Sequence, residues 1–235
     1  MRDRWRIAVI DSGLADGSQD GEARASSARM MTVIGARRFV DNGRKVSVGP
    51  AVSDPIGHGT AVTRAICSMS STTVELMIGQ VLNEEGVSTP AAVAAAIWWA
   101  IEARVGLIHM SLGLRADRCV LADAVADAVR AGCVVIASAP ARGGPTFPAT
   151  YAGVIRATGD ARCAEGEISV LGTAQAHFGG CPQYAGHRKF GGASIGAANV
   201  TGIVVARLTP ASGSESVRAQ LTVMARYRGV EMKLA

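Results

Sequence analysis

The chain has 235 residues, of which 49% are apolar but only 4% aromatic, and its formal net charge is +5. This length suffices for one α/β domain whose core is built from Ala, Val, Ile and Leu. No apolar run reaches the roughly 18 residues of a membrane span and no apolar leader precedes the first strand, so we expect a cytoplasmic protein with no membrane partner. The modest positive charge argues against a nucleic-acid partner; the basic segment between residues 24 and 45 is interpreted as a solvated face or as a surface for an acidic peptide.

The five cysteines are widely spaced and form no CxxC pair, which predicts reduced, structural thiols. They are Cys67, Cys119, Cys133, Cys163 and Cys181. No cluster of Cys and His has the spacing of a zinc site, so neither a metal nor a cofactor is expected.

Residues 7–11 form a β-branched, apolar run that predicts a buried parallel strand. Asp11 ends this strand, where open α/β sheets place their ligands, although an Asp before Ser-Gly is also an ordinary turn residue. Residues 14–56 predict a loop-rich connection with one or two short strands and a turn at 41–43. His58, between two glycines, opens a predicted helix that ends near Ser68, and a strand is expected over residues 74–81.

Strands and helices then alternate. Helices are predicted from Thr89-Pro90 to about Arg104 and over 120–131, and strands over 107–112 and 133–138. This alternation predicts a doubly wound parallel sheet with helices on both faces. We expect a single domain over residues 1–235, with its core at about 6–208 and a last helix at about 215–227.

Residues 190–208 carry the most informative pattern. Gly191 and Gly192 allow a sharp turn, and Ser194 follows at the start of a helix expected over about 195–207. A helix N-terminus offers free backbone N–H groups and a positive dipole end, which suit a nucleophile whose attack creates an oxyanion. Taken alone, this stretch is more typical of an ordinary N-cap serine on a buried helix.

Three segments, IAVIDSG at 7–13, GHGTAV at 57–62 and GASIGAANVTG at 192–202, resemble in this order the three active-site blocks of subtilisin-like serine proteases. The resemblance implies a subtilisin-like fold and a catalytic triad of Asp11, His58 and Ser194. It also implies that Ser111, Leu112 and Gly113 bind an extended peptide as an added strand, and that Ser138, Ala139 and Pro140 line the substrate cleft.

The chain departs from the family at Ala193, which replaces the usual Thr, at Ala198-Asn199, which replaces Pro-His, and in three further places. Ala141 occupies the position of the Asn that donates to the oxyanion, a loss that costs roughly 10²–10³-fold in rate in this family. The Ser194 backbone N–H would remain, and Arg142 or a neighbouring hydroxyl is an alternative donor. His109 replaces a buried Asn and is interpreted as a core residue. The link 69–73 is too short to wrap a calcium ion, so the family's calcium site is expected to be absent.

The function expected from these features is that of a serine endopeptidase, restricted to maturing a specific peptide or protein substrate in the cytoplasm. A second interpretation is a catalytically impaired pseudoprotease that binds peptides or acts as a scaffold, with Ala141 marking lost chemistry. A third is an esterase or transpeptidase with the same triad, because esters need less oxyanion stabilisation than amides.

Overall fold

The computed structural model describes residues 4–15, 31–184, 189–210 and 213–230. In these residues the strands are β1 (Arg6–Asp11), β2 (Met31–Asp41), β3 (Val46–Pro50), β4 (Val74–Gln80), β5 (Leu107–Met110), β6 (Val134–Ser138), β7 (Ile155–Gly159), β8 (Ile168–Val170), β9 (Phe178–Gly180) and β10 (Tyr227–Arg228). The helices are α2 (His58–Ser68), α3 (Pro90–Glu102), α4 (Cys119–Arg130), α5 (Ala193–Arg207) and α6 (Ser214–Met224).

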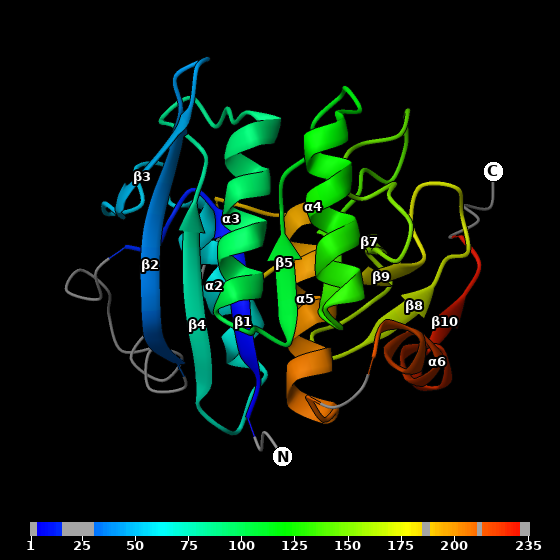
Figure 1. Cartoon of the computed structure of the whole chain (residues 1–235). Helices are drawn as coiled ribbons and strands as arrows, with labels where there is room; N and C mark the ends of the chain where they lie inside the picture. The colour runs from blue at the N-terminus through cyan, green and yellow to red at the C-terminus, as the bar shows by residue number, and fades with distance from the viewer. Residues whose placement is uncertain (1–3, 16–30, 185–188, 211–212, 231–235) are drawn as a thin grey trace.

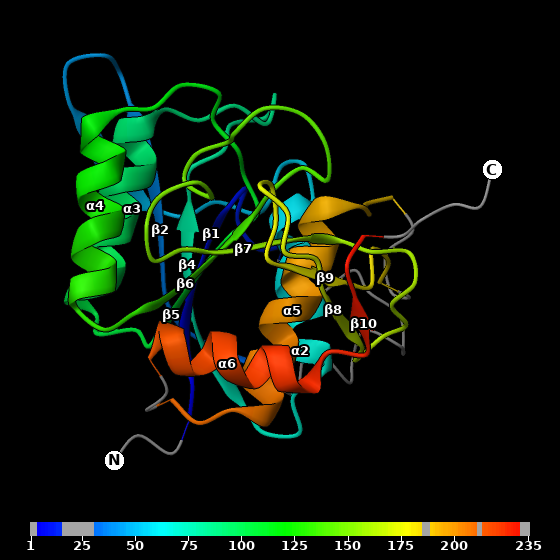
Figure 2. The same ribbon diagram turned by 90° about the vertical axis from the view of Figure 1, so that its right-hand side faces the viewer.

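The described strands form one sheet in the order β10-β8-β9-β7-β6-β5-β1-β4-β2-β3 (Figure 1). Pairing is parallel from β9 through to β2 and antiparallel between β2 and β3 and between β8 and β9. Helices α3 and α4 cover one face of the sheet, and α2 and α5 cover the other (Figures 1 and 2). The predicted α/β fold with a parallel, doubly wound sheet is confirmed.

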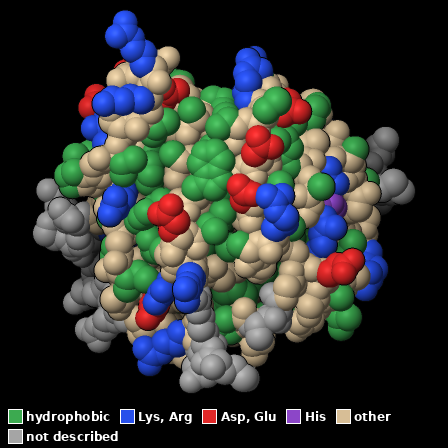
Figure 3. Space-filling model, viewed as in Figure 1, with side chains coloured by type: hydrophobic (Ala, Val, Ile, Leu, Met, Phe, Trp, Pro, Cys, Tyr) green, Lys and Arg blue, Asp and Glu red, His purple; other side chains and the backbone are tan. Residues whose placement is uncertain are grey.

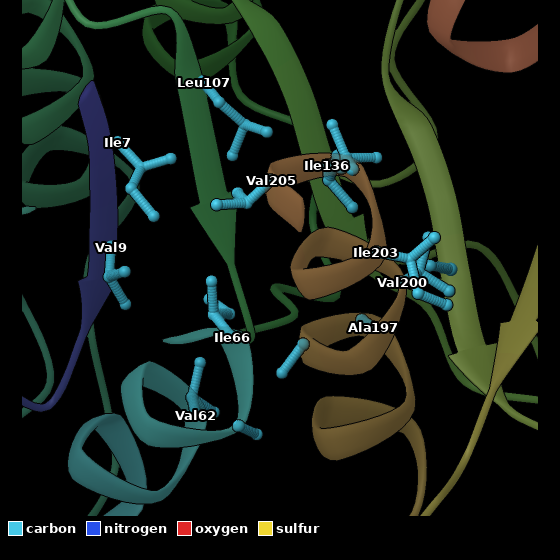
Figure 4. Packing of buried hydrophobic residues seen from close by; sticks show 14 of the residues in the cluster. Ile7, Val9, Val62, Ile66, Leu107, Ile136, Ala197, Val200, Ile203 and Val205 are labelled. Atoms are coloured by element: carbon cyan, nitrogen blue, oxygen red, sulfur yellow. The ribbon is translucent and has the colours of Figure 1, made fainter. Parts of the chain in front are cut away.

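The alternation of side chains along the central strands divides the core into two layers. Ile7 and Val9 of β1 pack with α2 and α5, whereas Ala8 and Ile10 pack with α3 and α4. Figure 4 shows the first layer, in which Ile66 of α2 and Val205 of α5 lie against the sheet. Because both faces are covered, the strands read as continuous apolar runs in the sequence.

Local signals set the helix ends where the sequence predicts them. Thr89 accepts a hydrogen bond from the Ala92 N–H at 3.2 Å, and Pro90 occupies the first turn of α3. After α4, Gly132 has a φ of 81°, the left-handed conformation of a C-terminal glycine. These ends fix the length of the two helices that cover one face.

Two expectations about the chain need correction. Residues 14–56 include an eleven-residue strand, β2, rather than only short strands; β2 pairs with β4 and turns at Asn42 into β3. The last helix stops at Met224, and Tyr227 belongs to β10, which pairs with β8. The length of β2 and the presence of β10 depend on these pairings, which a local sequence pattern does not reveal. Arg24 and Arg29 of the basic segment lie outside the described residues.

The surface charges, the cysteines and possible membrane or metal-binding features bear on the expectations from the sequence. On the face seen in Figure 3, acidic and basic side chains are interspersed with apolar ones. All five cysteines are free thiols; Cys67, Cys133 and Cys163 are buried, and Cys119 is exposed. Within the described ranges, no helix has the length and apolar character of a membrane span, and no three His, Cys, Asp or Glu side chains are grouped to bind a metal.

Candidate active site

Three predicted catalytic residues come from three elements on one side of the sheet. Asp11 is the last residue of β1 and shares the side of Ile7 and Val9, the side covered by α2 and α5. His58 is the first residue of α2, and Ser194 is the second residue of α5. The strand parity and the two helix starts therefore direct an acid, an imidazole and a hydroxyl toward the same end of the sheet.

Two glycines allow these helices to approach the sheet closely. A Cβ atom at Gly59 would lie 2.4 Å from the Gly13 carbonyl oxygen, in the turn that follows β1. A Cβ atom at Gly196 would lie 2.4 Å from the Thr158 carbonyl oxygen, at the end of β7. Any side chain at either position would push the helix start, and with it His58 or Ser194, away from the sheet.

Asp11 and His58 form a direct pair. His58 Nδ1 lies 2.7 Å from Asp11 Oδ1, and the Asp11 side chain is 1% exposed. The same carboxylate oxygen accepts the Ser12 N–H at 2.7 Å. Because a carboxylate can only accept, Nδ1 carries the proton and Nε2 is left as the basic nitrogen of a neutral ring.

Charge near His58 favours its protonated form. Burial alone would lower the pKa of His58, but the hydrogen bond and charge of Asp11, with the charge of Asp54, outweigh burial and raise the pKa above its usual value. A base with a raised pKa accepts a proton more readily, as general-base catalysis requires.

Asp54 is a site residue that the sequence analysis did not find. Its Oδ1 accepts the N–H groups of Ile56 and Gly57, at 3.2 and 2.9 Å, and its Oδ2 accepts the N–H and hydroxyl of Thr60, at 2.9 and 2.7 Å. Burial acts to raise the pKa of Asp54, but the hydrogen bonds from Thr60 and its neighbours lower it overall. Asp54 thus holds the start of α2, on which His58 sits; an Asp six residues before a Thr at a helix start was the available signal.

The Ser194 hydroxyl contacts the predicted substrate segment in this structure. It donates a long 3.4 Å hydrogen bond to the Ser111 carbonyl, and within the described part of the chain no hydrogen bond joins it to His58. The Ser111 hydroxyl in turn donates to the Ser194 carbonyl at 3.2 Å. Ser194 is therefore held beside the predicted substrate segment.

A cleft runs beside the Asp11–His58 pair. Its volume is about 450 Å³, and it is lined by His58, Ser111, Leu112, Gly113 and Phe190 together with Ile56, Leu82, Gly86, Val87, Ser88 and Leu114. The Phe190 ring meets the His58 imidazole edge-on, with centroids 5.3 Å apart. The three predicted residues 111–113 thus share a cleft with the histidine, and the contribution of Phe190 was not foreseen.

The other predicted cleft residues lie on the neighbouring strand end. Ser138 ends β6, which is paired in parallel with β5, so residues after the two strands emerge side by side. Ala139 and Pro140 line a smaller cavity of about 130 Å³ with Thr146. Ala141 lines a third cavity, of about 300 Å³, with Arg142 and Thr158. Its methyl side chain offers no hydrogen-bond donor, as the sequence predicts.

His109 is fully buried, which agrees with its interpretation as a core residue. Nδ1 lies 2.8 Å from Thr201 Oγ1, and Nε2 lies 2.8 Å from Ser111 Oγ. Burial, with a smaller effect of the His58 charge, lowers the pKa of His109 to about 3. The ring is neutral at neutral pH and connects α5 to the segment that contacts Ser194.

Comparisons with known proteins find relatives among the serine proteases. No family model matches the chain. Subtilisin DY of Bacillus licheniformis is 30% identical over 164 residues, which are 64% of this chain and 54% of that protein. The major intracellular serine protease of Bacillus subtilis is 30% identical over 167 residues, 64% of this chain and 49% of that protein. A thermostable alkaline protease of Halalkalibacterium halodurans is 29% identical over 160 residues, 64% of this chain and 40% of that protein.

Solved structures share the fold. One described as a lanthipeptide protease has a TM-score of 0.68 at 17% identity and covers 92% of this chain and 79% of its own. One described as S41 psychrophilic protease has a TM-score of 0.61 at 16% identity, and the match covers 94% of this chain and 82% of that structure's chain. The chain shares its fold with these two structures, and about 64% of it is similar in sequence to the subtilisin and serine proteases named above. It spans roughly half or less of the curated relatives named above, at 40–54% of their length.

Proposed function

We propose that the chain is a serine endopeptidase that cleaves peptide bonds through Asp11, His58 and Ser194. The observation that carries the proposal is the 2.7 Å bond between His58 Nδ1 and Asp11, which leaves His58 Nε2 as a base beside the cleft. Ser194, at the start of α5, contacts Ser111 in the lining of the same cleft. Homology to subtilisin-like serine proteases supports the same assignment.

In the proposed reaction, the Ser194 hydroxyl turns from the Ser111 carbonyl to His58 Nε2 and gives up its proton as Oγ attacks the substrate carbonyl carbon. The carbonyl π electrons move onto oxygen. The tetrahedral adduct collapses, the C–N bond breaks, and His58 donates the proton to the leaving amine. Water then repeats these steps on the acyl-enzyme, releasing the acid and restoring Ser194. Asp11 keeps the proton on Nδ1 and stabilises the imidazolium.

The oxyanion is stabilised from the N-terminus of α5. The N–H groups in the first turn of a helix lack partners within the helix, and that of Ser194 is adjacent to the attacking oxygen. Ala141 supplies no second donor from its side chain. We therefore expect slow turnover of amides, with esters less affected, because an ester has the better leaving group and needs less oxyanion stabilisation.

The substrate proposed is a peptide with apolar side chains near the cleavage point. Ile56, Leu82, Val87, Leu112 and Phe190 supply much of the lining of the cleft, and the described lining residues include no Lys or Arg. Restriction to one peptide in the cytoplasm is part of the proposal and is supported by the loss of a donor at Ala141 and by relatives named as intracellular serine proteases.

A fluorophosphonate probe tests the activity directly, because it modifies only a serine activated by its base. We expect one labelled residue, Ser194, with labelling lost in Ser194→Ala and strongly reduced in His58→Ala. Ser216→Ala, at an exposed serine of α6, is the matched control and should label normally. Wild-type protein that is folded yet unlabelled would refute the proposal in favour of the peptide-binding pseudoprotease.

The esterase and transpeptidase alternatives are resolved with matched substrates. Rates on a peptide amide and on the corresponding ester are compared, with and without an added amine acceptor. Measurable amide cleavage supports the endopeptidase. Ester turnover with no amide cleavage supports the esterase, and transfer of the acyl group to the amine supports the transpeptidase.

A further inference from the structure

A chain of hydrogen bonds lies beneath the candidate active site. It runs from Thr201 of α5 through the His109 ring to the Ser111 hydroxyl, with both contacts at 2.8 Å. From Ser111 it continues to the Ser194 carbonyl at 3.2 Å. His109 and Thr201 are fully buried and Ser111 is 6% exposed. Since bulk water cannot replace these partners, each contact in the chain holds its neighbour in place.

The direction of the protons in this chain follows from the chemistry of its groups. His109 is neutral at neutral pH, so one ring nitrogen donates and the other accepts. The Ser111 hydroxyl has one proton, which it directs at the Ser194 carbonyl. Ser111 Oγ must therefore accept the N–H of His109 Nε2, and Nδ1 accepts the hydroxyl proton of Thr201.

Thr201 has an alternative acceptor, the Ala197 carbonyl at 3.1 Å, and cannot donate fully to both. That carbonyl lies four residues before Thr201 in α5 and keeps its helical N–H partner. In the other tautomer Nδ1–H would donate to Thr201, Thr201 would donate to Ala197, and the Ser111 hydroxyl would have to leave the Ser194 carbonyl in order to donate to Nε2. The contact between Ser111 and the Ser194 carbonyl therefore requires the Nε2–H form of the ring.

We propose that His109 is a positioning residue that acts through Ser111 on the nucleophile. His109 orients the Ser111 hydroxyl through a hydrogen bond, and that hydroxyl donates to the Ser194 carbonyl. The Ser111 carbonyl in turn accepts a hydrogen bond from the Ser194 hydroxyl. His109 does not line the cleft and touches no reacting atom. An Asn at this position, which the resemblance predicts, is too short to reach Ser111 while bonded to Thr201. The link is thus a property of histidine here, and it rests on the proposed function of Ser194.

Two substitutions separate the two sides of the ring. The amide nitrogen of Gln can occupy the place of Nε2, whereas the amide of Asn reaches only the place of Nδ1. Two measurements are made on His109→Gln and His109→Asn. The first is the second-order rate constant of fluorophosphonate labelling, and the second is the kcat and KM for a peptide. We expect His109→Gln to label within about threefold of wild type. His109→Asn should label about tenfold or more slowly, because it loses the contact to Ser111.

A double-mutant cycle and a control variant complete the test. Ser111→Ala should slow labelling as much as His109→Asn, and the two changes together should cost no more than either alone. Thr201→Val, which cuts the other side of the ring, should lower the melting temperature but leave labelling within threefold. Equal rates for His109→Gln and His109→Asn in folded proteins, or additive losses in the double variant, would overturn the proposal.

Nitrogen NMR keeps this inference separate from the activity. The ¹⁵N shifts of His109 should report a neutral ring with the proton on Nε2, and that proton should shift in Ser111→Ala. A ring protonated on Nδ1, or on both nitrogens at neutral pH, refutes the positioning role even if Ser194 is labelled. A wild-type protein with the expected NMR pattern but no labelling refutes the proposed function alone.

Discussion

Replacement of Asp54 by Asn tests whether this carboxylate both holds α2 and tunes His58. The wild-type side chain accepts four hydrogen bonds at the start of α2. Asn keeps one oxygen for Ile56 and Gly57 but turns an N–H donor toward the N–H of Thr60. The Thr60 N–H then loses its acceptor, the contact to the Thr60 hydroxyl has to reverse its direction, and the negative charge near His58 disappears.

The loss resembles removal of a helix N-cap, which costs about 1–2 kcal/mol. For a protein of this size, that corresponds to a fall of about 2–8 °C in melting temperature. The pKa of Asp54 is lowered from 3.8, so its stabilisation is complete above that value and is lost as the pH falls through the lower folded value. The difference between D54N and wild type should therefore be full at pH 7 and shrink below about pH 4.

The second effect concerns the base. The Asp54 charge helps to raise the pKa of His58, so removing it should lower that pKa. The acid limb of the pH–rate profile for fluorophosphonate labelling should move to lower pH in D54N. Scanning calorimetry and labelling rates between pH 4 and 9 measure both effects.

The matched control is D41N, which removes the same charge at the β2–β3 turn, where Asp41 accepts the Gly43 N–H. It should leave the pH–rate profile unchanged. If D54N has the same melting temperature as the wild type at pH 7, Asp54 does not stabilise the start of α2. If D54N and D41N shift the acid limb equally, the effect is one of net charge and the assignment of Asp54 is wrong.

Three further predictions follow from the site. Asp11→Asn should slow labelling and turnover by roughly 10⁴-fold without unfolding the protein, because His58 then loses its preferred tautomer; a loss under tenfold, measured by stopped labelling, contradicts the triad. Burial lowers the pKa of His109 to about 3, so acidification from pH 7 to 5 should lower the free energy of unfolding of the wild type by about 2 kcal/mol through this residue. Calorimetry should find that the free energy of unfolding of His109→Asn falls less steeply over the same pH range. Gly196→Ala should abolish soluble folded protein or lower its melting temperature by more than about 10 °C, because its Cβ would lie 2.4 Å from the Thr158 carbonyl oxygen; a Tm near wild type would show that α5 can move.

The sequence was sufficient for most of the central architecture because its signals are local. Apolar β-branched runs predict the inner parallel strands, and Thr89-Pro90 and Gly132 mark helix ends through capping chemistry that acts within a few residues. The order of three short motifs identifies Asp11, His58 and Ser194 as candidates. The bond between Asp11 and His58 agrees with that selection.

Tertiary structure alone decided features that depend on residues distant in sequence. The length of β2 comes from pairing with β4, and Tyr227 is a strand residue because β8 lies beside it. Asp54 gains its importance from the helix start that it caps, and His109 from Thr201 on a helix 92 positions away. Pattern and propensity describe what a segment can form by itself, whereas these roles arise only when folding brings separate segments within hydrogen-bonding distance.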